Sequence, residues 1–151
     1  MLHSKIEEAR KFLKISDHMI YITFPAMKEN RLLIKILEQI SRAQRALIAF
    51  ILENEYDHKR IRLYMDPKAN FGTFLECAPR YGFKSEHLEA IKQTAAIMEM
   101  HSNSSMEFVR QDKFVIMSEG MHLESLTYEK VKNQLIRSQE MLKSVESRLK
   151  P

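Results

Sequence analysis

Apolar residues recur every three or four positions along much of the chain, which is the spacing of one buried face of an α-helix. One such stripe covers residues 4–24 and is followed by Pro25, where we expect the helix to stop. A second stripe begins after Asn30, a residue suited to a helix N-cap, and continues to about Asn54. The pattern therefore predicts a helix over 4–24 and a longer helix over 30–54.

Two further amphipathic helices are predicted in the second half of the chain. One runs from Ser85 to about His101, and the other begins at Thr127 and shows the clearest apolar stripe of all. A short helix is expected near 71–77. The apolar run from Phe114 to Met117 fits an extended segment or a buried turn equally well. These elements predict an all-α fold, an antiparallel four-helix bundle in a single domain over 1–151, with an irregular connection in the middle.

Residues 46–52, ALIAFIL, are apolar nearly all the way round the predicted second helix. Such a segment is either buried on several sides or packed against a second subunit. We expect the protein to form a homodimer whose interface contains Leu47, Phe50 and Ile51.

Positive charge is concentrated in the middle connection. The chain carries a formal net charge of +4, and residues 58–84 contain six basic but only two acidic side chains. The same stretch has four of the seven glycine and proline residues, which is typical of an irregular connection. Its cations alternate with aromatic residues, namely Tyr64, Phe71, Phe74, Tyr81 and Phe83.

Cations mixed with aromatic residues suit phosphate contacts combined with base stacking. The alternative is that the aromatic side chains pin the connection to the bundle while the lysines only keep it soluble. On the first interpretation, a nucleic acid is the partner. The expected binding residues are Lys59, Arg60, Arg62, Tyr64, Lys68, Arg80 and Lys84.

Metal, cofactor and thiol chemistry are not expected. The one cysteine, Cys77, allows neither an internal disulfide nor a thiolate cage within one chain. Two Glu-x-x-His pairs, Glu55/His58 and Glu119/His122, have the spacing of di-iron bundle ligands. The first lies at a helix end and the second spans a glycine, so we expect solvated side chains rather than a metal site. Three glycines cannot form a glycine-rich phosphate loop.

The order of the helices resembles the HEPN superfamily, helical bundles that often act on RNA or pair with nucleotidyltransferases in prokaryotic defence and toxin systems. The segments that carry the resemblance are IEEARKFLKISDHMIY, ILEQISRAQRALIAFILENE and YEKVKNQLIRSQEMLKSVESRL. Active members are metal-independent ribonucleases with an Arg followed, after four to six residues, by a His. The resemblance implies that such a His takes the proton of a ribose 2′-OH while the Arg stabilises the phosphorane, leaving a cyclic phosphate.

By position, the matching arginine is Arg110, but Val115 stands where the histidine is required. The leading hypothesis is therefore a non-catalytic HEPN-like bundle that dimerises and binds RNA, or an RNA-containing complex, through the basic connection. One alternative is a metal-independent ribonuclease that uses Arg80 and His87, which are separated by six residues. Another is a protein-interaction module, antitoxin-like or scaffolding, that buries residues 46–52 against a different protein.

The sequence also predicts where the protein acts. The first twenty or so residues mix charges with apolar positions and show no export signal. The longest nearly apolar run, residues 46–52, is far shorter than the roughly 20 residues that a membrane span needs. We therefore expect a cytoplasmic protein that does not cross a membrane.

Overall fold

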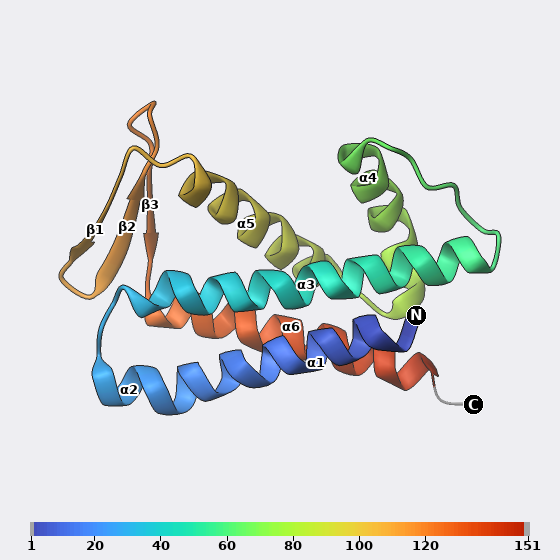
Figure 1. Cartoon of the computed structure of the whole chain (residues 1–151), viewed down its shortest axis with the longest axis horizontal. Coiled ribbons are helices and arrows are strands. Elements are labelled where there is room, and N and C mark those ends of the chain that lie inside the picture. The colour runs from blue at the N-terminus through green and yellow to red at the C-terminus, as the bar shows by residue number, and fades with distance from the viewer. Residues whose placement is uncertain (1, 150–151) are drawn as a thin grey trace.

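Four long helices form the body of the protein in the computed structural model, which describes residues 2–149 (Figure 1). They are α1 (Leu2–His18), α3 (Leu32–Asp57), α5 (Ser85–Ser102) and α6 (Tyr128–Leu149). Helix α3 is central and packs against α1, α5 and α6. A shorter helix, α4 (Pro67–Cys77), lies near one end of α3, and a small sheet lies at the other end.

The first helix does not stop at Pro25 as predicted. After α1 the chain makes one wide π-helical turn, η1 (Met19–Thr23), and continues into α2 (Phe24–Met27), with Pro25 in its first turn. The Tyr128 hydroxyl donates a 2.9 Å hydrogen bond to the Ile20 carbonyl, and its ring stacks on Phe24 with centroids 5.0 Å apart. These contacts tie the wide turn to the start of α6. A left-handed Lys28, with φ of 51°, ends α2.

The basic connection is mostly helical rather than irregular. The Asp66 side chain accepts a 3.1 Å hydrogen bond from the Lys68 backbone N–H and caps α4. A 3-10 turn, η2 (Ala78–Tyr81), follows α4 directly. It ends at Gly82, whose φ is 82° and where a Cβ atom would lie 2.3 Å from the Ser144 Oγ. Only glycine fits this close approach between the connection and α6.

The prediction of an all-α four-helix bundle is wrong, because residues 106–126 form a three-stranded antiparallel sheet. Its strands are β1 (Met106–Arg110), β2 (Lys113–Met117) and β3 (Leu123–Leu126), in the order β1-β2-β3. The central strand opposes Val115 to Phe108 on one side and to Ser125 on the other. Phe114, Val115 and Ile116 are all buried, so β2 lacks the alternation by which a strand is recognised in a sequence.

The core consists of two apolar clusters along α3. One joins the second half of α3 to α1, α4, η2 and α6, and the other joins its first half to the sheet. Leu47, Phe50 and Ile51 belong to the first cluster and are 0%, 1% and 0% exposed. Side chains of the same chain bury them, so these three residues offer no surface to a second copy. Among residues 2–149, no helix combines the length and apolar character that a bilayer crossing needs.

Candidate nucleic-acid interface

The seven residues predicted to bind RNA divide between an exposed loop, residues 58–66, and the helices that follow it. The loop leaves the end of α3 and arches over to the start of α4 (Figure 1). Lys59, Arg60, Arg62 and Tyr64 lie on this loop, and Lys68 lies in the first turn of α4. Arg80 lies in η2 and Lys84 just before α5, on the far side of α4 in the chain.

Most of the aromatic residues in the connection pack inward. Phe74, Tyr81 and Phe83 are buried, and Phe71 is half-buried against the same core cluster. The rings of Phe74 and Phe83 meet edge to face with centroids 6.1 Å apart. These side chains anchor the connection to the bundle, which leaves Tyr64 as the exposed aromatic residue of the five.

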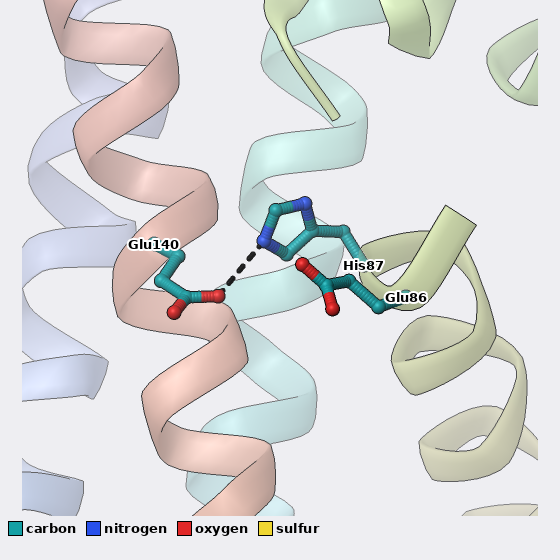
Figure 2. A group of neighbouring side chains, drawn as sticks. All are labelled: Glu86, His87 and Glu140. Atoms are coloured by element: carbon teal, nitrogen blue, oxygen red, sulfur yellow. Dashed lines mark hydrogen bonds and ion pairs between the residues drawn. The ribbon is translucent and has the colours of Figure 1, made fainter. Parts of the chain in front are cut away.

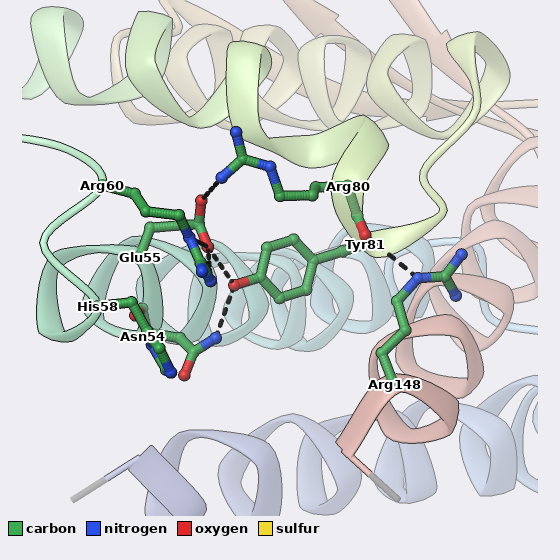
Figure 3. A network of polar contacts seen from close by, with 7 residues as sticks. All are labelled: Asn54, Glu55, His58, Arg60, Arg80, Tyr81 and Arg148. Carbon is green, nitrogen blue, oxygen red and sulfur yellow. Dashed lines mark hydrogen bonds and ion pairs between the residues drawn. The ribbon is translucent and has the colours of Figure 1, made fainter. Parts of the chain in front are cut away.

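The charges of Arg60 and Arg80 converge on the carboxylate of Glu55 (Figure 3). The expectation of a solvated side chain at this position is wrong, because the fold buries Glu55 completely. Glu55, at the end of α3, has a fully buried side chain and accepts a 2.8 Å hydrogen bond from the Arg60 Nη2. Arg80 pairs with its other oxygen. The Tyr81 hydroxyl donates to Glu55 at 2.9 Å and accepts at 2.7 Å from the Asn54 amide.

Burial opposes the ionisation of Glu55, but its hydrogen bonds from Arg60 and Tyr81 and the two guanidinium charges outweigh that effect. The pKa of this carboxyl therefore lies below its ordinary value. Because one carboxylate is shared by two guanidiniums, the group keeps a single positive charge. The arginine side chains are 43% and 58% exposed, so each still presents N–H groups to solvent.

Four of the predicted cations are exposed and have no carboxylate partner within the described part of the chain: Lys59, Arg62, Lys68 and Lys84. The loop that carries two of them is held in shape by Asn70. The side-chain amide of Asn70 accepts from the Tyr64 backbone N–H at 2.7 Å and donates to the Tyr64 carbonyl at 2.7 Å. This clamp fixes the loop while the Tyr64 ring remains 49% exposed. The loop therefore carries exposed positive charge and an accessible aromatic ring on a backbone that Asn70 holds in place.

His87, the proposed catalytic base of the ribonuclease alternative, has a structural role (Figure 2). It is buried in the first turn of α5, and its Nδ1 accepts a 2.9 Å hydrogen bond from the Lys84 backbone N–H. Its proton therefore lies on Nε2, which donates to the Glu140 Oε1 at 3.0 Å. With both nitrogens engaged, the ring has no free lone pair to accept a proton. Arg80 pairs instead with Glu55 on α3, whereas His87 pairs with Glu140 on α6.

The hydrogen bonds of His87 also disfavour a metal ion at this position. Among residues 2–149, three side chains with potential metal-ligand atoms lie close together: Glu86, His87 and Glu140. Their ligand atoms all lie within 4.8 Å of one another. A metal on Nε2 of His87 would move the ring proton to Nδ1, where it would oppose the Lys84 N–H. Arg137 also pairs with both carboxylates, at 3.6 Å and 3.3 Å. The cluster is therefore better suited to an ion-pair network than to a metal, and the hydrogen bond from His87 holds the pKa of Glu140 below its usual range.

The remaining candidates from the sequence do not form a reactive site. His58 turns its Nδ1 to the Asn54 carbonyl at 2.7 Å, while Glu55 faces the arginines. Burial, with the nearby charge of Glu55, raises the pKa of the Cys77 thiol and disfavours a thiolate nucleophile. Arg110 lies beside the β1–β2 turn, opposite Lys113, and Val115 is buried in β2. The segment matched to the HEPN motif is thus a β-hairpin.

Comparison with protein-family models, with curated proteins and with solved structures finds no match for this chain.

Proposed function

We propose that the protein is a non-catalytic domain that binds single-stranded RNA, in the cytoplasm, through the loop 58–66 and the adjoining start of α4. The observation that carries this proposal is a set of exposed cations without carboxylate partners in the described part of the chain, Lys59, Arg62 and Lys68, on the same short segment as the exposed ring of Tyr64. Unpaired lysines and arginines attract the phosphate backbone, and an accessible aromatic ring stacks on an unpaired base of any identity.

The arrangement gives each residue a separate role. Lys59, Arg62 and Lys68 would contact successive phosphates along the arch of the loop, while Tyr64 would stack on a base between them. Arg60 and Arg80 would contribute through the N–H groups that Glu55 leaves free. These contacts are made to phosphates and to the faces of bases. We therefore expect the affinity for RNA to depend weakly on the RNA sequence and strongly on the salt concentration.

A binding function without cleavage is supported by the state of His87. Both ring nitrogens make hydrogen bonds within the protein: Nδ1 accepts from the Lys84 backbone N–H at the start of α5, and Nε2 links α5 to Glu140 on α6. Val115, in place of the histidine that the HEPN motif requires, supports the same conclusion. The protein is therefore proposed to hold RNA rather than to process it.

Charge reversal on the loop tests the proposal. We would titrate a labelled single-stranded RNA with the wild type and with the double variant Arg62→Glu/Lys68→Glu, and measure fluorescence anisotropy at low salt. The expected result is a loss of affinity of at least about tenfold. The matched control is Lys35→Glu/Lys92→Glu, which changes net charge equally at two exposed positions on α3 and α5. Equal affinities for the two double variants would contradict the proposal.

A further inference from the structure

A groove of about 430 Å³ lies between α5, α6 and β3, over the first half of α3. Its floor is formed by the buried amide of Gln134 and by apolar side chains, which are Leu37, Ala90, Ile97, Leu126 and Val131. Its rim is charged, with carboxylates from Glu86, Glu89 and Glu124 and cations from Lys130 and Arg137. An apolar floor with a charged rim suits an occupant that has an apolar end and charged flanks.

The rim favours a positively charged occupant. Arg137 pairs with Glu86 at 3.6 Å, and Lys130 pairs with Glu124 at 3.9 Å, so both rim cations are neutralised within the chain. Glu89 is exposed and forms no ion pair with the residues that the structure describes. The groove therefore has one carboxylate free to meet a cation from outside.

The arched loop of the same molecule carries exposed apolar side chains next to a positive charge, which is the chemistry that the groove suits. We define the apolar tip as Leu63, Tyr64 and Met65, three consecutive residues of the arched loop that are 43%, 49% and 101% exposed. Neighbouring large apolar side chains exposed on one loop are typical of an interaction surface. The unpaired cation Arg62 precedes the tip directly. The tip therefore has the apolar end and the positive flank that the groove suits.

The tip cannot fill the groove of its own chain. The arched loop and strand β3 lie at opposite ends of the molecule (Figure 1), and the Asn70 clamp fixes the loop next to α4. We propose that the protein self-associates by placing the apolar tip of one copy in the groove of a second copy, with Arg62 of one facing Glu89 of the other. This surface replaces Leu47, Phe50 and Ile51, which the core already buries.

This inference does not rest on the proposed function, but it has a consequence for it. Arg62 and Tyr64 serve both contacts, so self-association and RNA binding exclude each other. A loop seated in a groove covers less surface than a stable dimer interface, so the contact belongs to the weak, transient class. Free RNA is then expected to convert the associated form to monomers.

Sedimentation velocity over about 5 to 500 μM protein, without RNA, tests the contact directly. The expected result is an average mass that rises with concentration for the wild type. Met65→Asp should lower the association constant by about tenfold or more, because it would bring a carboxylate to the apolar floor. The matched control, Met27→Asp on α2, changes a methionine that is 62% exposed and should associate like the wild type. A wild type that stays monomeric, or a Met65→Asp variant that associates equally well, would overturn the proposal.

Exchange of charges between copies tests the partner that we assign. Arg62→Glu and Glu89→Lys should each associate several-fold more weakly than the wild type. An equimolar mixture of the two should regain association, because each tip then meets a groove of opposite charge. A mixture that associates no better than the separate variants would overturn the Arg62–Glu89 pairing. Since RNA is absent, these results are independent of whether the anisotropy titration shows binding.

Discussion

The hydroxyl of Tyr81 donates a 2.9 Å hydrogen bond to the Oε2 of Glu55, which joins η2 to the last turns of α3. The same oxygen accepts from Arg60, and Arg80 pairs with the other. Both ends of the basic connection are therefore tied to one buried carboxylate. The arginines at this junction support the fold first and contribute to any binding surface only through their exposed N–H groups.

Removal of the Glu55 charge should destabilise the protein. Glu55→Gln keeps the size of the side chain but loses charge-assisted hydrogen bonds, so we expect the free energy of unfolding to fall by about 2 kcal/mol in urea denaturation. Because the pKa of Glu55 is lowered in the folded state, the stabilisation is present above the unfolded-state pKa and is lost as pH falls through the folded-state pKa. The difference between wild type and variant should therefore be constant near neutral pH and shrink under acid conditions. A difference that grows on acidification would contradict this role.

Two neighbouring arginines should respond differently to charge reversal. Arg60→Glu would place a carboxylate beside the buried Glu55, whereas Arg62 is exposed and has no ion pair among the described residues. We expect Arg60→Glu to lower the Tm by roughly 3 °C or more and Arg62→Glu to leave it within about 1 °C. Thermal unfolding followed by circular dichroism measures both. Equal shifts in Tm for the two variants would contradict a stabilising role for the ion pair between Arg60 and Glu55.

His87 should matter for stability and not for chemistry. His87→Ala removes the acceptor for the Lys84 N–H and the hydrogen bond to Glu140, so we expect a loss of about 2 kcal/mol in the free energy of unfolding. RNA incubated in EDTA with the wild type or with the variant should remain intact. Glu86→Gln, at an exposed neighbour, is the stability control. Cyclic-phosphate ends formed by the wild type and absent with His87→Ala would instead support the ribonuclease alternative.

The ring of Tyr64 should contribute to RNA affinity through stacking. Tyr64→Ala is expected to weaken binding of single-stranded RNA by about 1–3 kcal/mol, and Tyr64→Phe to retain it, since both rings stack. Tyr56→Ala, at a tyrosine that is 51% exposed outside the loop, should have little effect. Anisotropy titrations of the wild type and the three variants measure these differences in affinity. If Tyr64→Ala and Tyr56→Ala bind alike, the ring is not a stacking platform.

Helix positions could be predicted from the sequence because helical periodicity is visible wherever one face is buried. The helix predicted over 30–54 is observed as Leu32–Asp57, and the one opened by Thr127 as Tyr128–Leu149. The sequence leaves Phe114 to Met117 open between an extended segment and a buried turn, and it does not predict the sheet, because Phe114 to Ile116 are buried on both faces and show no period of two. The helix that passes through Pro25 was ended too early, because a proline fits the first turn of α2 after the π-helical turn.

The candidate site was predicted only in part. Local composition located the unpaired cations, but burial of Phe74, Tyr81 and Phe83 depends on contacts with distant segments. Glu55 carried a signal that could have been used. It lies four residues after Ile51 on an apolar stripe, where a carboxylate is stable only if partners neutralise it. Those partners, Arg80 and Tyr81, are brought near by the fold and could not be assigned from spacing.

The salt dependence of RNA binding tests the central claim most directly. The measurement is anisotropy of a short labelled single-stranded RNA titrated with wild-type protein at several salt concentrations. Contacts to three or four phosphates predict that the logarithm of the association constant falls linearly with the logarithm of salt concentration, with a slope of about −2 to −3. Arg62→Glu/Lys68→Glu should make that slope shallower by about 1.4, because each lost phosphate contact on a single strand removes about 0.7. Absence of binding at low salt, or affinity that salt does not change, would contradict a nucleic-acid role for the basic loop.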